Sequence, residues 1–328
     1  GLNTPTLSDI TLTYVVNAAP SIQTVTASQG SSGTVSVSYE VKDTDTNSGT
    51  VNPGYITPSF EYWSGSSWAN ITSGLATIAT TTKVVNQSTF TSYNTTWTAS
   101  TTIGSQYYSA AKIRVTANDG EAANNTATAE SSTFVLDTTA PSSVSILVKA
   151  TTTPAIINLS ASDNSSIQMK VGLNSDLSDA SWESYSASKS LSLATNPDTV
   201  YARFKDAYGN ESSTISASSQ TTPSNMMIQD TSNINASPDE LRFFLAWDVV
   251  SDPALCFGSY HVYRSTDSAS WALLSTVGTR TTNYYTDSTP SASATYYYKI
   301  ATVDSSGNTS FMSATSTGVA NGIQDGSE

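Results

Sequence analysis

The sequence has very few of the residues that build disulfides, metal clusters and catalytic centres. Its 328 residues include one cysteine, Cys256, and one histidine, His261. A lone cysteine excludes an intrachain disulfide, a zinc ribbon and an iron–sulfur site, and a lone histidine excludes a multi-histidine metal centre. We therefore expect stability to come from packed cores, with bound ions as a further source.

Charge is also scarce, and little of it is positive. Charged residues make up 12% of the chain, and 26 acidic residues against 13 Lys and Arg give a net charge of −13. Nucleic-acid binding requires a basic face, so this balance argues against it. The longest apolar run lies near Phe243–Trp247. It falls far short of the ~20 residues that span a bilayer, so we expect no membrane insertion.

The residues that are abundant favour β-structure. Ser and Thr make up about a third of the chain, and there are 17 tyrosines. β-Branched and aromatic residues suit strands, whereas the strong helix formers are few. Since 38% of the residues are hydrophobic, the chain is not a disordered tail either. The composition predicts an all-β protein.

Three proline-containing segments divide the chain. They read Asn17-Ala-Ala-Pro20, Asp137-Thr-Thr-Ala-Pro141 and Gln220-Thr-Thr-Pro223. Proline cannot donate to a strand ladder, so it suits the entry to a new domain. We expect an N-terminal strand at 1–17, an elongated array of three β-sandwiches at 18–137, 138–222 and 223–320, and a tail at 321–328.

A repeated ending supports this division. The run 296–303 alternates with period two and leads into Asp304-Ser-Ser-Gly-Asn308, while 200–205 leads into Asp206-Ala-Tyr-Gly-Asn210. Alternation places every second side chain on one face of a strand, and Asp, Gly and Asn favour the turn that follows. A strand and turn that recur 98 positions apart, from 206 to 304, are an internal repeat at domain scale.

These residues carry a resemblance to known families. The third body resembles a bacterial fibronectin type III domain through Trp247, "YHVYRSTD" at 260–267 and "TYYYKIATVDSSGN" at 295–308, with Tyr296 at the corner-tyrosine position. The second resembles bacterial immunoglobulin-like modules through "DTTAPSSVSI" (137–146), "LSASDNS" (159–165) and "VYARFKDAYGNES" (200–212). The first is similar through 111–141, and its strand order is open over 70–100. The resemblance implies fold and little about function, because such sandwiches serve many roles.

The leading segment alternates well but has no body of its own. Ile10, Leu12, Tyr14 and Val16 share one face. The segment is either an edge strand, or the last strand of a preceding domain, or a donor strand. In the last case it would complete a sandwich in another copy and build a head-to-tail filament.

Acidic residues gather at the expected inter-strand loops. In this topology one pole of each sandwich meets the preceding linker, which would bring together acidic and amide groups suited to Ca²⁺ at the domain junctions. The alternative is that these side chains bond turn backbones. The candidate ligands are Asp43, Asp45, Asn47, Asp119, Asp137, Asp163, Asp206 and Asp304.

Aromatic residues cluster around the turn in "EYWSGSSW" at 61–68. Tyr62, Trp63 and Trp68 could stack on glycans, or they could pack at the core and edge of the sandwich, which is the more frequent use of tryptophan.

We expect no enzymatic activity. His261 lies in the expected strand "YHVYR", and Cys256 suits a small buried apolar position. The sequence favours an extracellular, cell-surface structural or adhesive protein whose partners are copies of itself or other surface components. The alternative is the accessory spacer or carbohydrate-binding region of a secreted polysaccharide-degrading enzyme.

Overall fold

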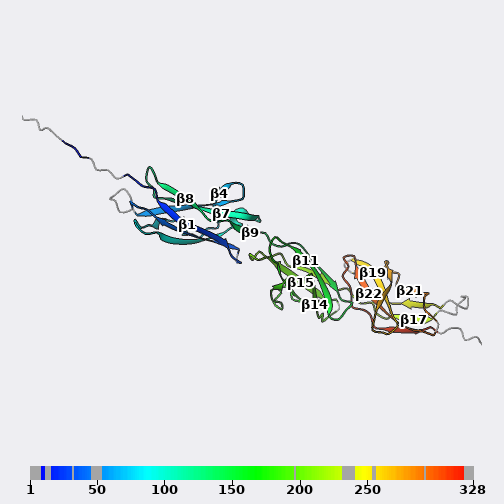
Figure 1. Cartoon of the computed structure of the whole chain (residues 1–328). Helices are drawn as coiled ribbons and strands as arrows, with labels where there is room; N and C mark the ends of the chain where they lie inside the picture. Colours follow the sequence, from blue (N-terminus) through cyan, green and yellow to red (C-terminus); the bar gives the residue numbers. More distant parts are fainter. Residues whose placement is uncertain are drawn as a thin grey trace, which may run out of the picture. The chain divides into compact units, whose positions relative to one another are not determined.

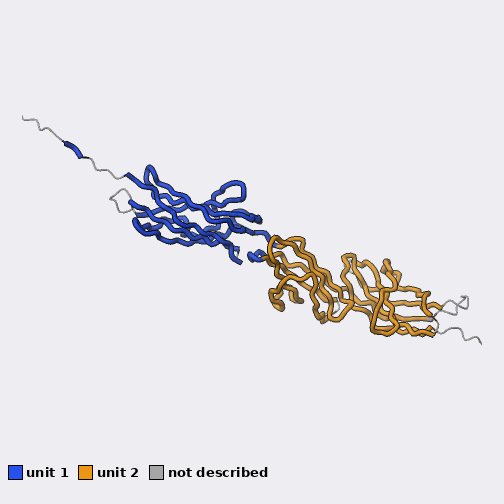
Figure 2. Tube along the Cα trace, viewed as in Figure 1, with its two compact units in different colours: residues 1–140, 207–210 blue, residues 141–206, 211–328 orange. Residues whose placement is uncertain are grey.

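The computed structural model describes residues 9–11, 16–31, 33–45, 54–195, 197–230, 241–252, 256–291 and 293–320 (Figure 1). The described chain is built of antiparallel strands and one short helix, α1 (Ser100–Ile103). Two compact units are present (Figure 2), and each is treated by itself: unit 1 holds residues 1–140 and 207–210, and unit 2 holds residues 141–206 and 211–328.

Unit 1 contains one sandwich. Its first sheet has the order β1-β2-β6, and its second has the order β4-β3-β7-β8, with β5 pairing β3 and β9 pairing β7. The strands are β1 (Ser21–Gln29), β2 (Thr34–Lys42), β3 (Tyr55–Trp63), β4 (Trp68–Asn70), β5 (Lys83–Val84), β6 (Thr91–Thr98), β7 (Tyr107–Asn118), β8 (Thr126–Glu130) and β9 (Phe134–Asp137). Both sheets contribute to one core, in which β2 buries Val35, Val37, Tyr39 and Val41 by alternation.

Unit 2 begins with a second sandwich. One sheet has the order β10-β11-β14 and the other the order β13-β12-β15-β16. The strands are β10 (Ser142–Lys149), β11 (Ala155–Ser162), β12 (Gln168–Gly172), β13 (Glu183–Ser184), β14 (Ser188–Leu191), β15 (Thr199–Lys205) and β16 (Ile215–Ser218). Alternate residues of β15 (Val200, Ala202 and Phe204) point into its core.

The third sandwich also belongs to unit 2. Its sheets have the orders β17-β18-β21 and β20-β19-β22-β23. The strands are β17 (Met227–Asp230), β18 (Phe243–Ala246), β19 (Phe257–Ser265), β20 (Ala272–Val277), β21 (Tyr284–Asp287), β22 (Thr295–Asp304) and β23 (Ser316–Val319). Trp247, Tyr260 and Tyr298 are buried in the core between them. The all-β prediction and the prediction of tandem sandwiches are confirmed.

Hydrogen bonds join the two sandwiches of unit 2. The Val148 amide donates to Asn308 Oδ1 over 2.8 Å, and the Thr309 amide donates to the Val148 carbonyl over 2.8 Å. Parallel bridges pair Lys149 with Thr309 and Gln220 with Ser310. Phe311 of the third sandwich packs against the core of the second. The loop that ends β22 therefore continues the hydrogen bonding of β10.

The leading segment lies partly outside the described residues, which exclude Leu12, Tyr14 and the stretch 1–8. Residues 9–11 and 16–20 belong to no strand, and the side chains of Ile10 and Val16 are each 65% exposed. The described part of the segment thus does not form an edge strand of the first sandwich. Residues 321–328 also lie outside the described part.

Candidate cation site and other predicted sites

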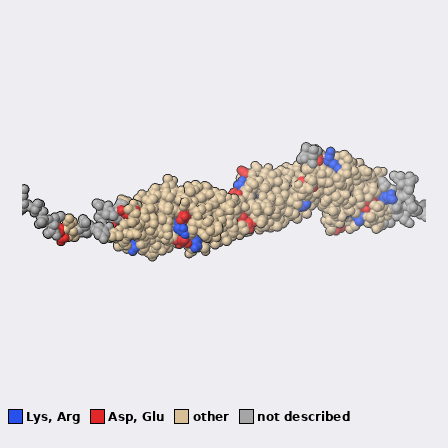
Figure 3. Space-filling view, turned by 90° about the horizontal axis from the view of Figure 1, so that it is seen from above, with Lys and Arg blue, Asp and Glu red and all other residues tan. Residues whose placement is uncertain are grey.

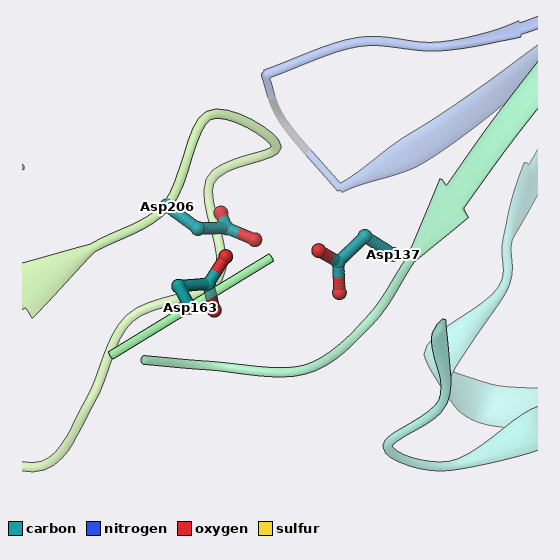
Figure 4. Close-up of side chains that lie close together, drawn as sticks. All are labelled: Asp137, Asp163 and Asp206. Carbon is teal, nitrogen blue, oxygen red and sulfur yellow. The ribbon is translucent and has the colours of Figure 1, made fainter. Parts of the chain in front are cut away.

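Asp163 and Asp206 lie on two loops of the second sandwich. Asp163 follows β11 and Asp206 follows β15. A carboxylate oxygen of each lies within 4.8 Å of one from the other, and Figure 4 shows the two side chains close together. Asp206 is 2% exposed. Asp163 Oδ1 accepts hydrogen bonds from the Ser165 amide at 2.8 Å and the Ser165 hydroxyl at 2.9 Å.

Two carboxylates at this distance repel each other. Coulomb's law gives about 3 kcal/mol for unit charges 4.8 Å apart at an effective dielectric of ~20. Solvent at the half-buried Asp163 lowers this figure. A divalent cation between the oxygens would turn the repulsion into attraction, and carboxylates are ligands that Ca²⁺ prefers. The pair therefore has the chemistry of part of a calcium site.

Asp137 is the last residue of β9 in unit 1 and is also drawn in Figure 4. Its Oδ1 accepts from the Thr139 amide at 2.9 Å and the Thr139 hydroxyl at 2.5 Å. The residue is fully buried, and its Oδ2 has no hydrogen-bond donor. A buried carboxylate oxygen without a partner destabilises the fold, and a cation bound to it would offset that cost.

The backbone around Asp137 is held in place within unit 1. Its amide donates to Gln29 Oε1 at 2.6 Å, and Gln29 Nε2 donates back to its carbonyl at 2.6 Å. The same carbonyl accepts from Asn210 Nδ2 at 3.0 Å. The Asp137 side chain therefore starts from a fixed backbone position and needs little ordering to bind a ligand.

The acidic residues of the first sandwich hold the segment that enters it. Asn17 Nδ2 donates to Asp119 Oδ2 at 3.0 Å, and the Ala18 amide donates to Asp45 Oδ2 at 2.7 Å. Asp43 is buried, and its amide donates to the Asn86 carbonyl at 3.1 Å. Among the described residues none of these three acids belongs to a cluster of three close metal-ligating side chains. Asn47 lies outside the described residues.

Asp304 is surrounded by hydrogen-bond donors. Its Oδ1 accepts from the amides of Ser306 at 2.9 Å and Asn308 at 2.7 Å. Its Oδ2 accepts from Asn308 Nδ2 at 2.8 Å and Gln220 Nε2 at 3.1 Å. Each oxygen therefore has two donors, which matches the turn-making alternative at this position.

The aromatic hairpin is packed and covered. The rings of Trp63 and Trp68 lie 5.5 Å apart, and the Arg114 guanidinium lies 3.8 Å from the Trp68 ring centre. Arg114 is held there by Glu130 at 2.9 Å and by Glu61 at 3.5 Å. Tyr62 packs against the buried Trp97 at 5.4 Å. This arrangement favours the packing interpretation, because the cation occupies a face that a sugar would need.

The surroundings of His261 and Cys256 shift the pKa values of both side chains. Burial, with Lys149 nearby, lowers the pKa of His261 below its ordinary value. The centre of its ring lies 6.3 Å from that of the Tyr263 ring. Burial and the charges of Asp252 and Asp304 raise the pKa of the Cys256 thiol. A raised pKa leaves less thiolate, which is the reactive form of cysteine.

Charged side chains are sparse on the surface that Figure 3 shows, where most atoms belong to other residue types. Among the described residues no helix is long and apolar enough to cross a membrane.

No family model and no curated protein matches the chain. Among solved structures it is similar to the FN1–FN3 domains of chicken CNTN1, at 10% identity and a TM-score of 0.29, over 93% of this chain and 98% of that one. It is also similar to the sixth fibronectin type III domain of human fibronectin type III domain containing protein 3, at 13% identity and a TM-score of 0.26, over 33% of this chain and 91% of that one. A third similarity is to a pectate lyase of Pectobacterium carotovorum, at 20% identity and a TM-score of 0.22, over 32% of this chain and 29% of that one. The sandwich assignment rests on the sheets and cores described above.

Two contributors to these sites were missed by the sequence reasoning. Gln220 and Lys149 both contact the turn that follows β22, the latter by donating from its ammonium group to the Gly307 carbonyl. The sequence does contain a pattern that marks Gln220: it is the first residue of Gln-Thr-Thr-Pro, just as Asp137 is the first residue of Asp-Thr-Thr-Ala-Pro. No local pattern marks Lys149.

Proposed function

We propose that the chain is a non-catalytic structural protein of the cell exterior, in which β-sandwich modules hold other parts of an assembly at a set spacing. The observation that carries this is the joint within unit 2. Backbone and side-chain hydrogen bonds connect β10 to the turn after β22, and the partly buried Phe311 packs against the neighbouring core. A joint of this kind fixes the distance and angle between two modules, which is what a spacer requires.

Small-angle X-ray scattering of the full chain tests the spacer proposal. The wild-type profile is compared with that of the double variant Asn308→Ala and Phe311→Ala, which removes one hydrogen-bond acceptor and one apolar anchor from the joint. We expect the distance distribution to broaden in the variant. A wild-type profile as broad as that of the variant contradicts the proposal, because the joint would then be loose already. Leu273→Ala, at an exposed position of β20, is the matched control.

Calcium is part of the same proposal. Asp163 and Asp206 would supply carboxylate ligands from neighbouring loops of the second sandwich. In unit 1, taken by itself, the buried Oδ2 of Asp137 is a separate candidate ligand. The remaining ligands of a six- to eight-coordinate ion would be carbonyl oxygens and water. Binding would offset the repulsion between Asp163 and Asp206 and stabilise the two loops that carry them.

Calorimetric titration of the full chain with CaCl₂ tests the ion. We expect one site with a dissociation constant of about 0.1–1 mM, the range of extracellular calcium modules, and its loss in Asp163→Asn. Asp176→Asn, an exposed turn aspartate of the same sandwich, is the control and should bind as the wild type does. Absence of binding heat, with a melting curve unchanged by EDTA, removes calcium from the proposal.

Association between copies would use the leading segment. Its apolar residues Ile10 and Val16 remain exposed, and β1 pairs only with β2 among the described strands, which leaves an edge for strand addition. We expect polymers of the full chain in negative-stain micrographs and monomers after deletion of residues 1–17. Deletion of residues 321–328 is the control. Polymers that persist without residues 1–17 would rule out this route.

A further inference from the structure

Two linkers of the chain share a sequence pattern and differ in their first residue. One reads Asp137-Thr-Thr-Ala-Pro141 and the other Gln220-Thr-Thr-Pro223. The sandwich that follows each linker carries an Asp-x-x-Gly-Asn turn, at 206–210 and 304–308 respectively. Asp137 and Gln220 are therefore equivalent in sequence. A carboxylate can only accept hydrogen bonds, whereas an amide can also donate.

Within unit 2 the Gln220 amide uses that donor. Its Nε2 lies 3.1 Å from Asp304 Oδ2, and the same oxygen accepts from Asn308 Nδ2 at 2.8 Å. Asp304 is nearly buried, so a negative charge there needs compensation. Neutral donors supply it, and among the described residues Asp304 belongs to no cluster of metal-ligating side chains.

The turn that Asp304 organises is also the turn that joins the two sandwiches. Asn308 Oδ1 accepts from the Val148 amide, and Thr309 Oγ1 accepts from the Ala150 amide at 2.8 Å. Gly307 has a φ of 92°, a conformation that glycine adopts without strain. Anything that disturbs Asp304 should therefore loosen the end of β10 in the neighbouring sandwich.

We propose that the side-chain amide of Gln220 takes the place of a divalent cation beside Asp304, so that the two sandwiches of unit 2 stay joined without any metal ion. Residue 220 then decides whether this joint depends on metal. A carboxylate at this position would face Asp304 with the same charge and would create a demand for a cation. The contrast with Asp137 rests on the calcium proposal above, but the claim about unit 2 stands apart from it.

The test is Gln220→Glu in the full chain, followed by hydrogen–deuterium exchange of peptides covering 146–150 and 304–310. In wild type we expect the same exchange rate in EDTA and in about 5 mM CaCl₂, which exceeds the ~1 mM constants of weak calcium modules. In Q220E we expect exchange about tenfold faster in EDTA and a return toward the wild-type rate in CaCl₂. KCl of equal ionic strength should not restore it.

The matched control is Gln168→Glu, which adds the same charge at an exposed position of β12 and should not alter exchange in these peptides. Gln220→Met removes the donor without adding charge, so its exchange should rise and not respond to calcium. If Q220E does not fold in EDTA, recovery of folded chain in CaCl₂ supports the proposal.

Three results would overturn the proposal: wild-type exchange at 304–310 that quickens in EDTA, exchange in Q220E equal to wild type, or a Q220E defect that calcium leaves unrepaired. The calcium proposal has its own readout in the same experiment, namely the peptides that contain Asp163 and Asp206. Their indifference to EDTA would count against calcium at that site and leave the assignment of Gln220 intact.

Discussion

Asp287 should be the most sensitive acidic residue of the third sandwich. It ends β21, is fully buried, and accepts four hydrogen bonds. Tyr298 donates its hydroxyl to Oδ2 at 2.6 Å and Arg264 its guanidinium at 2.9 Å, while the Thr289 amide and hydroxyl donate to Oδ1 at 2.9 and 2.7 Å. In Asp287→Asn an amide replaces one carboxylate oxygen and leaves the Arg264 charge half-buried without its counterion.

Removing one partner of a buried ion pair lowers the free energy of unfolding by about 3–5 kcal/mol. For the Arg264–Asp287 pair we expect the lower end of this range, because Arg264 keeps its contact with the Tyr296 ring at 5.0 Å and its hydrogen bond to Thr289. For a cooperative unit of this size, 1 kcal/mol shifts the melting temperature by ~2–4 °C, so D287N should melt about 10 °C lower. Differential scanning calorimetry of the full chain measures this. Glu183→Gln, on the surface of the second sandwich, should lose less than about 1 kcal/mol. A loss in D287N no larger than in that control refutes the reasoning.

The same residue sets a pH dependence. Burial alone would raise the pKa of Asp287, but the hydrogen bonds from Tyr298, Thr289 and Arg264 outweigh it and hold the pKa below its ordinary value. A carboxylate whose folded-state pKa is depressed stabilises the fold above its unfolded value of about 3.9, and that stability disappears as pH falls through the folded value. Wild type and D287N should therefore converge in stability below about pH 4. A gap that stays constant from pH 7 to pH 3 contradicts this assignment.

Three further predictions concern other parts of the chain. Phe311→Ala should lower the free energy of unfolding by about 2 kcal/mol. Although Phe311 belongs to the third sandwich, its loss should quicken hydrogen exchange in β11 and β15 of the second, against whose core it packs. Exchange changes confined to the third sandwich would contradict this packing. Arg114→Ala should cost about 1 kcal/mol and alter tryptophan fluorescence by uncovering Trp68, and unchanged fluorescence would contradict that cover. The Cys256 thiol, whose pKa is raised by burial and nearby acids, should react with iodoacetamide more slowly at pH 7 than a free cysteine does, and equal rates would contradict its environment.

Strand positions could be predicted from sequence where alternation is strong. The expected strands 260–265, 271–277 and 296–303 lie within or close to β19, β20 and β22. The interval 70–100, whose strand order the sequence left open, contains the short β5, the eight-residue β6 that pairs with β2, and an isolated bridge between Leu75 and Trp97. Threonine-rich stretches alternate too weakly to fix a register, so local pattern could not settle this part.

Part of the candidate site could also be predicted, for a topological reason. The loops after β11 and β15 open at the same pole of a sandwich, so Asp163 and Asp206 were expected together and lie within 4.8 Å of one another. The same reasoning placed Asp304 among cation ligands, and it could not foresee that Asn308 and Gln220 would satisfy that carboxylate. Loop position follows from topology, whereas the donors around an acid depend on residues distant in sequence.

Because positive charge is scarce in this chain, the compensation of each buried acid matters more than it would in a protein rich in Lys and Arg. Asp137, Asp206, Asp287 and Asp304 are all buried or nearly so, in a chain with only 13 Lys and Arg. Cations of the chain can compensate only a few of them, as Arg264 does for Asp287. Amides compensate Asp304, and under the calcium proposal an ion would compensate Asp206 together with Asp163. Because a neutral amide stays in place whatever the solvent contains, the joint beside Asp304 should tolerate changes in salt and metal that would alter the Asp163–Asp206 pair.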